Sequence, residues 1–291
     1  MKLAVPRLRL PSFRLGGIST CLGIHFNDKV LRVIELNKDK KPVGEAIEVS
    51  LEGRDRAVVL LEVVNKYGLS GKYANVCIPM DEGLLKYYKY PATMSGNDLK
   101  NAIDWSIKRE LQAMREETYY DYFIIEPQPG GKHVGVVLVM SRKETVESIK
   151  RAVESAGLKL RVLDYEVVAI VNYGLYHKLP VPFSILYMDY NYSLLTTYST
   201  SNISYYATYW SYKEFMDTGD EESIDSFFAE IRNLVVLNDL SSMYVAGPVL
   251  AEEEMLTRMM ENLPILGLLD IEGIKPNFFI PYILSIRGLE E

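Results

Sequence analysis

The sequence predicts an α/β protein built from two similar lobes. One strand–turn–strand pattern occurs twice, at 22–36 and at 184–198. In each copy an apolar run leads through a short polar turn into a second strand-like run, which is typical of a β-hairpin. Because further strand and helix patterns follow each hairpin, we expect a duplicated architecture with a cleft between the lobes.

Helix and strand signals alternate after the first hairpin. Asp55 and Gly68 are typical of a helix start and a helix end, and Ser95 is a second helix cap. In chain order we expect a helix at 55–67, strands at 73–78 and 84–90, a helix from Ser95 to Leu111, strands at 119–126 and 133–140, a helix at 143–156 and a strand at 160–165. From strand 84–90 onward, this order predicts a small α/β subdomain at about 80–164, inserted in the first lobe.

The domain organisation follows from these elements. We expect a basic arm at 1–20, a first lobe at 21–180 and a shortened second lobe at 181–291. The arm carries scattered cations with Pro6 and Pro11 between them, so it favours an extended segment over a helix on an anionic membrane surface. Between Thr208 and Met243 one helix, at 224–237, is strongly predicted.

Composition excludes several function classes. The 291 residues are 48% hydrophobic and carry a net charge of −7, which disfavours nucleic-acid binding because phosphate neutralisation needs a basic face. Cys21 and Cys77 lack metal-ligand spacing, and we expect no metal site. No apolar run approaches the roughly 20 residues of a membrane-spanning helix. We expect a cytoplasmic protein that meets a membrane only peripherally.

Several short motifs follow one another in a characteristic order and spacing. They are Gly23 to Leu36, Ile78-Pro79, the run 89–95, Ile103-Asp104-Trp105, Tyr120-Asp121-Tyr122, the run 139–143, Ala156-Gly157-Leu158 and the run 163–166. Together they resemble the PilM family of type IV pilus assembly proteins. The resemblance thins afterwards but covers most of the chain. It implies an actin-like fold, with ribonuclease H-like duplicated lobes.

The nucleotide site that this fold implies is degenerate at its first turn. In actin-like ATPases the first strand ends with an Asp, and small residues follow so that backbone N–H groups approach the phosphates. Here His25 stands at the Asp position, Asn27 at the turn glycine and Asp28 at the first serine. A carboxylate about 5 Å from a phosphate charge costs roughly 3 kcal/mol at an effective dielectric near 20.

The second and third turns carry comparable changes. Asp189 persists, but Asn191 replaces a glycine, and Gly247 is followed by Pro248, which has no N–H. We therefore expect a vestigial pocket with no catalytic residue and no cofactor, and ATP with magnesium is disfavoured. Its members are Gly23, His25, Asn27, Asp28, Asp189, Asn191 and Gly247.

Some of these residues have a second interpretation. His25 could be a metal ligand or general base, although a hydrogen-bonded structural histidine is favoured. Asp28 and Asp189 could form an acid–base pair, although a turn residue and a cap are favoured. The tyrosine-rich run 187–212 could stack on bases, although alternating aromatics favour a half-buried strand.

The resemblance also implies a partner. PilM-like proteins bind the short cytoplasmic N-terminal tail of a bitopic inner-membrane protein of the PilN type, and other pilus or secretion components are further candidates. The resemblance places the groove between the first lobe and its inserted subdomain. Candidate contact residues there are Tyr87, Tyr88, Tyr90, Trp105 and Arg109. Alternate members of this set would equally suit the subdomain core.

The sequence thus predicts a non-enzymatic scaffold of a type IV pilus or related secretion machine. Three alternatives stay open: an ATP-binding actin-like pilus protein, the cytoplasmic domain of a type II secretion platform protein of the GspL type, and a sugar kinase. The platform protein would continue into a membrane span. The kinase would need a catalytic Asp and a glycine-rich adenosine loop, and neither is complete here.

Overall fold

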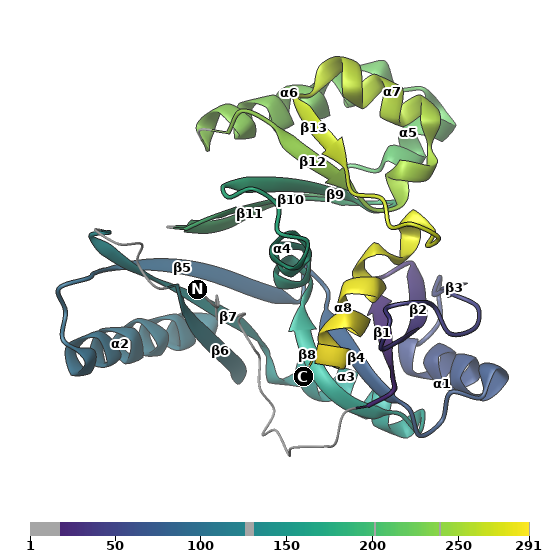
Figure 1. The fold of residues 1–291 in the computed structure, drawn as a ribbon, viewed down its shortest axis with the longest axis horizontal. Helices are drawn as coiled ribbons and strands as arrows, with labels where there is room; N and C mark the ends of the chain where they lie inside the picture. The colour runs from purple at the N-terminus through teal and green to yellow at the C-terminus, as the bar shows by residue number, and fades with distance from the viewer. Residues whose placement is uncertain (1–17, 126–130, 201, 239, 291) are drawn as a thin grey trace. The chain divides into compact units, whose positions relative to one another are not determined.

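The computed structural model describes residues 18–125, 131–200, 202–238 and 240–290, so most of the predicted basic arm lies outside the described residues. The chain divides into two compact units (Figure 1). Unit 1 takes the chain up to Ala169, with Thr200–Ser204 and Pro281–Glu291, and unit 2 takes Ile170–Ser199 and Tyr205–Ile280. The units therefore divide near residue 169 and not at the predicted 180, and the end of the chain belongs to unit 1.

Unit 1 is built on a five-stranded sheet of order β3-β2-β1-β4-β8. Its members are β1 (Thr20–Phe26), β2 (Val30–Asn37), β3 (Ile47–Ser50), β4 (Tyr73–Ile78) and β8 (Lys159–Tyr165), with helices α1 (Arg56–Tyr67) and α3 (Lys143–Ser155). The predicted first hairpin is confirmed as β1 and β2. Asp55 caps α1 by accepting the N–H groups of Ala57 and Val58, and Gly68 ends it at a φ of 63°.

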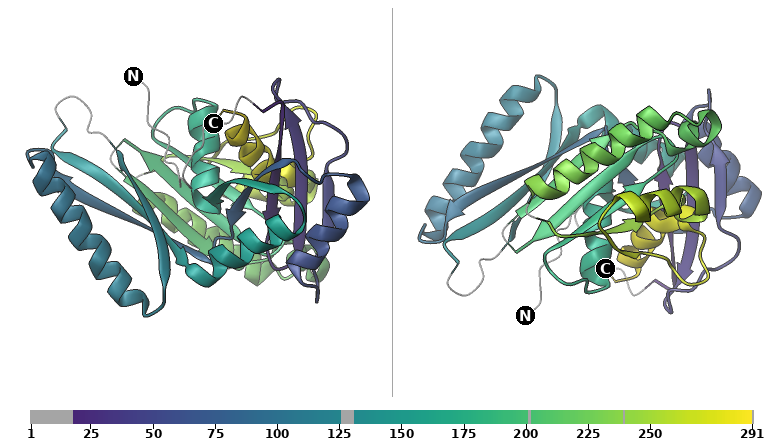
Figure 2. Two further views of the ribbon diagram at one scale, coloured as in Figure 1. Left: turned by 90° about the horizontal axis from the view of Figure 1, so that it is seen from below. Right: turned by 90° about the horizontal axis from the view of Figure 1, so that it is seen from above.

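The inserted subdomain is smaller than predicted. It comprises β5 (Gly83–Pro91), α2 (Gly96–Met114), β6 (Thr118–Ile125) and β7 (His133–Arg142), and its sheet has the order β5-β7-β6. In both views of Figure 2, α2 runs along one face of this sheet, where Ile103 and Ile107 pack on Val136 and Leu138. The predicted limit at 164 is wrong, because β8 pairs in parallel with β4 and α3 is their crossover helix.

Unit 2 repeats the strand order of unit 1. Its sheet, β11-β10-β9-β12-β13, again has an antiparallel meander followed by two parallel strands. The elements are β9 (Phe183–Met188), β10 (Ser193–Ser199), β11 (Asn202–Thr208), α5 (Tyr212–Thr218), α6 (Glu221–Leu237), β12 (Met243–Ala246), η1 (Pro248–Ala251), α7 (Glu253–Asn262), β13 (Ile265–Leu268) and η2 (Pro276–Phe278). The first residues of β11, up to Ser204, are grouped with unit 1. The second hairpin and α6 are confirmed, whereas α5 is a seven-residue helix that the sequence pattern does not predict.

One helix follows the last strand of each sheet in the chain. Helix α4 (Glu166–Tyr176) comes after β8, and α8 (Phe279–Glu290) comes after β13. The part of α8 in unit 1 packs directly on β1. A Cβ at Gly23 would lie 1.7 Å from the carbonyl oxygen of Pro281, and one at Gly288 would lie 2.3 Å from the sulfur of Cys21. Two glycines thus permit this close approach, and α8 joins unit 1 for that reason. No helix in the described part of the chain is long and apolar enough to cross a membrane.

Candidate functional site

A cavity of about 340 Å³ lies in unit 1 between the subdomain and the five-stranded sheet. We call it the β6–α3 groove. Its walls come from β6, β7, α3 and the carboxyl-terminal part of β4 with β8. The lining residues are Ile78, Tyr119, Tyr120, Asp121, Val139, Met140, Ser141, Val146, Glu147, Lys150, Leu160 and Leu163. Most of the lining is apolar, so the groove suits an apolar ligand segment.

Helix α3 supplies one wall. Val146, Glu147 and Lys150 are spaced i, i+1 and i+4, which brings them to one side of the helix. The Tyr119 hydroxyl donates to the Glu147 carboxylate at 3.0 Å and so links β6 to α3 across the groove. This hydrogen bond to a carboxylate raises the pKa of Tyr119. The hydrogen bond therefore connects the two walls of the groove at this point.

Polar groups also line the groove. Lys150 is half-buried, and among the described residues no carboxylate forms an ion pair with its ammonium group. Asp121 already accepts the backbone N–H of Tyr122 at 2.8 Å. An occupant thus meets apolar side chains together with the Lys150 ammonium group and the carboxylates of Asp121 and Glu147.

The residues predicted to contact a partner lie elsewhere on the subdomain. Tyr88 and Tyr90 pack beneath α2, Trp105 is 63% exposed on that helix, and the Arg109 guanidinium lies 5.1 Å from the Trp105 ring. Tyr87 lies beside Gly135 on the opposite sheet face, away from α2. The structure brings four of the five together, but none of them lines the β6–α3 groove.

A buried carboxylate holds that α2 surface in place. Glu110 pairs with Lys86 and accepts from Arg109 Nη2 at 3.1 Å. The hydrogen bond from Lys86 is the main reason that the pKa of Glu110 falls to about 2. Burial raises the pKa of the neighbouring Tyr88 to about 12. These contacts connect α2 to β5. They explain, without a bound partner, why the side chains of Tyr88 and Arg109 are held in place.

The groove residues were not evident from the sequence one by one. Val146, Lys150 and Leu160 have no motif of their own. The available signal was the resemblance, because the motifs at 120–122, 139–143 and 163–166 all contribute to the walls. Strands far apart in sequence meet there only through the tertiary fold.

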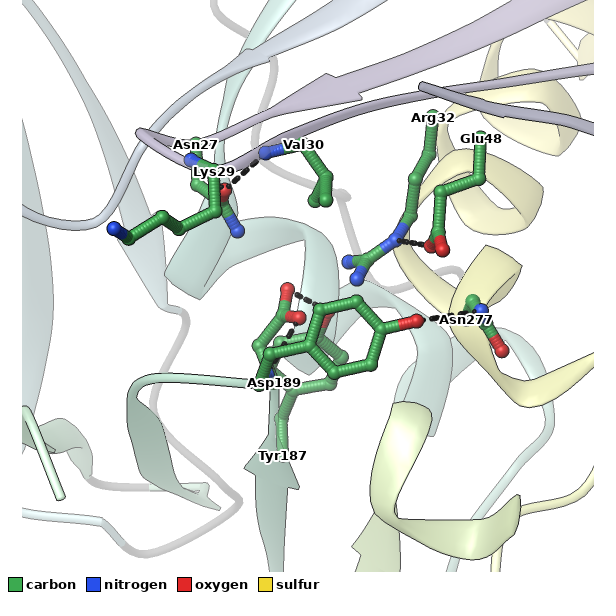
Figure 3. Close-up of polar contacts among 9 residues, drawn as sticks. Asn27, Lys29, Val30, Arg32, Glu48, Tyr187, Asp189 and Asn277 are labelled. Carbon is green, nitrogen blue, oxygen red and sulfur yellow. Dashed lines mark hydrogen bonds and ion pairs between the residues drawn. The ribbon is translucent and has the colours of Figure 1, made fainter. Parts of the chain in front are cut away.

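The first predicted phosphate turn is closed by its own side chain (Figure 3). The Asn27 side-chain oxygen accepts the N–H groups of Lys29 at 2.8 Å and Val30 at 3.0 Å. Those are backbone donors that a phosphate would need. Asp28 adds a carboxylate to the turn. The pKa of Asp81 is raised mainly by its own burial, and the charge of Asp28 raises it further. The turn therefore uses backbone donors internally, and Asp28 adds a negative charge beside the positive charge of Lys29.

His25 is fully buried in β1. Its Nε2 lies 3.4 Å from a Glu166 carboxylate oxygen, and neither ring nitrogen has a hydrogen-bond partner among the described residues. The interpretation of His25 as a structural histidine stays a prediction. Across the hairpin His25 pairs with Arg32, whose Nε donates to Glu48 at 2.6 Å, as Figure 3 shows.

Asp189 in unit 2 is likewise engaged by its own surroundings. Its two oxygens accept the Tyr187 hydroxyl at 3.0 Å and the Tyr190 backbone N–H at 2.8 Å (Figure 3). Its own N–H donates to the Tyr192 carbonyl at 3.0 Å, which closes the turn. These bonds favour the turn-and-cap interpretation over an acid–base role.

The other two predicted residues of unit 2 lie near this turn. Asn191 follows within it, and its buried side-chain oxygen has no hydrogen-bond partner among the described residues. Gly247 has a φ of 96°, and a Cβ there would lie 2.7 Å from the Tyr187 ring and 2.8 Å from the Met188 carbonyl oxygen. Gly247 is thus required by the packing of β12 beside β9.

Both turns use backbone N–H groups for internal hydrogen bonds. Side-chain oxygens of Asn27 and Asp189 occupy the N–H groups of Lys29, Val30 and Tyr190, which are therefore not free to bind phosphate oxygens. In the described ranges no three His, Cys, Asp or Glu side chains are grouped so as to hold a metal ion.

Comparisons with known proteins agree on the fold. A family model described as type IV pilus assembly protein PilM matches residues 31–182. No curated protein matches the chain. A solved PilM–PilN type IV pilus biogenesis complex has a TM-score of 0.73 at 15% identity, with 95% of this chain and 100% of that chain covered.

Two further solved structures share the fold. The cytoplasmic domain of EpsL, a type II secretion component of Vibrio cholerae, has a TM-score of 0.55 at 12% identity, covering 94% and 96% of the two chains. A Bacteroides thetaiotaomicron protein with an actin-like ATPase fold has a TM-score of 0.54 at 9% identity, covering 92% and 96%. The fold is actin-like, and, because the family model matches more than half of its residues, the chain belongs to the PilM family of type IV pilus assembly proteins.

Proposed function

We propose that this protein is a scaffold of a type IV pilus or related secretion assembly that holds the N-terminal cytoplasmic tail of a PilN-type inner-membrane protein in the β6–α3 groove. The observation that carries the proposal is this groove in unit 1, mostly apolar and about 340 Å³ in volume. The solved relative described as a PilM–PilN complex supports the choice of partner. Bound in this way, the protein docks beneath the inner membrane.

The groove has the chemistry for a short apolar segment. Val139, Val146 and Leu163 supply apolar surface on three different elements, and burying apolar ligand area there is worth about 25 cal/mol per Å² before the cost of ordering the tail. The Tyr119–Glu147 hydrogen bond keeps the two walls in place without the partner. Such preorganisation lowers the cost of binding.

The scaffold acts without nucleotide hydrolysis. The support is that both turns satisfy their own backbone donors, through Asn27 in unit 1 and Asp189 in unit 2. A phosphate would have to displace these side chains, and the negative charge of Asp28 opposes its approach. Binding of the tail is then the whole biochemical activity of the groove.

Titration calorimetry with a synthetic tail tests the proposal. The probe is a peptide of the first residues of the PilN-type protein encoded in the same genome, about ten residues or roughly 33 Å when extended. It should bind the wild type. Val146→Asp should weaken binding by at least about tenfold, because it places a charge in an apolar wall.

Two control variants make the result specific to the groove. Val58→Asp introduces the same charge at a valine on α1 that is 52% exposed and outside the groove. Trp105→Ala removes the exposed ring on α2. Both should leave the affinity within about twofold. Equal affinities of folded Val146→Asp and Val58→Asp would move the site elsewhere, and a loss in Trp105→Ala would favour the α2 surface. A wild type that binds no such tail would refute the proposal.

A further inference from the structure

We propose that the bound tail adds to β6 as a fourth strand of the subdomain sheet, so that backbone hydrogen bonds hold it and alternate side chains enter the groove. This inference rests on the proposed function, and it specifies how the tail is recognised. Three features carry it: the edge position of β6, the direction of its backbone groups and the course of the groove along it.

Strand β6 lies at an edge of its sheet. Among the described residues, the order β5-β7-β6 leaves one side of β6 without a neighbouring strand, as Figure 1 shows. Edge strands usually carry Lys, Pro or a bulge that prevents further pairing. The sequence of β6, TYYDYFII, has no Lys or Pro and one charged residue, Asp121, and its register with β7 is continuous over eight residue pairs. The edge is therefore competent to accept another strand.

The direction of each backbone group follows from the register. Lys143 N–H donates to the Glu117 carbonyl at 2.8 Å, which extends the β6–β7 ladder by one hydrogen-bonded pair. Hydrogen-bonded pairs alternate in an antiparallel ladder, so Tyr119 and Asp121 turn their N–H and C=O groups toward β7. The groups of Thr118 and Tyr120 then point outward.

Hydrogen bonds on both edges of the sheet agree with this assignment. Tyr122 N–H, outward by the same rule, donates to the Asp121 carboxylate and not to β7. On the other side of β7, Ala92 N–H donates to the Lys132 carbonyl at 2.9 Å, so these two residues form a hydrogen-bonded pair. Counting alternate pairs along the register from there, the backbone groups of Gly83 in β5 point away from β7. The Gly83 carbonyl indeed accepts the Tyr165 hydroxyl at 3.2 Å.

The groove runs along this free edge. Tyr119, Tyr120 and Asp121 of β6 line it, and so do Val139, Met140 and Ser141 of the neighbouring strand β7. The groove therefore borders the edge strand and the strand beside it. Tyr119 and Tyr120 are 44% and 46% exposed, so the described part of the chain leaves this edge open.

The geometry sets the chemistry of the tail. A strand paired with Tyr120 directs every second side chain toward the face of Val139, where the apolar lining of Val146 and Leu163 lies. Because Asp121 occupies the N–H of Tyr122, pairing centres on Thr118 and Tyr120. The ligand class is an extended segment with apolar residues at alternate positions.

A scan of backbone N-methylation in the tail peptide tests this inference. Each methyl group removes one N–H donor and keeps the side chain. Methylation of the residues facing β6 should weaken binding by about tenfold or more, and methylation of the residues between them should change it by less than about twofold. Strand addition therefore predicts losses that alternate along the peptide, whichever direction the tail takes.

The protein offers a matched pair of variants. Tyr120→Pro removes an outward N–H that the β6–β7 ladder does not use, and Tyr120→Ala removes only the side chain. With melting temperatures close to each other, the Pro variant should bind at least about tenfold more weakly than the Ala variant. Methylation losses without alternation, or equal binding by the two variants, would show that the tail does not pair with β6 while leaving the proposed function intact. Failure of the unmethylated peptide to bind would overturn both.

Discussion

Replacing Gly23 by Ala separates two roles for this glycine. As a residue of a nucleotide pocket, it would affect ligand binding and leave the fold intact. In the structure it is the position at which α8 contacts β1: an added Cβ would lie 1.7 Å from Pro281 O and 2.9 Å from the Ser285 backbone nitrogen. Both atoms belong to the α8 backbone, so the helix must move as a body.

The expected cost follows from the hydrogen bonds that this movement breaks. They run from Ser285 Oγ to the Cys21 carbonyl, at 2.7 Å, and from Asn75 Nδ2 to the Leu284 carbonyl, at 3.0 Å. Each is worth about 1 kcal/mol, and overpacking adds about 1–3 kcal/mol. A decrease of about 4 kcal/mol is a large part of a typical stability of about 5–15 kcal/mol. It should lower the melting temperature by roughly 8–16 °C.

Thermal unfolding followed by circular dichroism measures this effect. Gly96→Ala is the matched control, because an added Cβ there meets nothing within 4 Å and the residue begins α2 in the same unit. It should leave the melting temperature within about 2 °C, since Ala favours a helix. Gly23→Ala with a melting temperature equal to that of Gly96→Ala would refute the packing role.

Two further predictions concern charge. Glu110→Gln should lower the melting temperature at pH 7, and the gap to the wild type should narrow below pH 4.5. The Glu110 carboxylate stabilises the fold above its unfolded pKa of about 4.5, and this contribution is lost as the pH falls toward its folded pKa of about 2. Because Lys86 is 39% exposed, we expect the ion pair to contribute only about 1–2 kcal/mol. A difference in melting temperature that does not depend on pH would contradict the role of this ion pair. Calorimetry should find no micromolar binding of ATP with magnesium, and the combined change His25→Asp, Asn27→Gly, Asp28→Ser should raise the affinity; no rise would place the cause in the second unit.

The sequence by itself determined the local elements and the duplicated plan. Asp55 and Gly68 delimit α1 as predicted, and both hairpins occur where alternating apolar runs flank polar turns. These features depend on interactions between near neighbours in the chain, such as caps and turn hydrogen bonds. The motif order also indicated the family, because spacing between short segments is a property of the sequence alone.

Only the tertiary structure decided where the groove lies and which residues pack in the core instead of lining it. Val146 and Leu163 become two walls of one cavity because β8 pairs with β4 and α3 crosses between them. Tyr88, Tyr90 and Trp105 drew attention in the sequence as binding residues, yet they lie with α2 on another surface. Gly23 and Gly288 owe their role to α8, which returns from the far end of the chain. Contacts between segments this distant leave no periodic pattern in the sequence, because each segment keeps the same local pattern whichever partner it packs against.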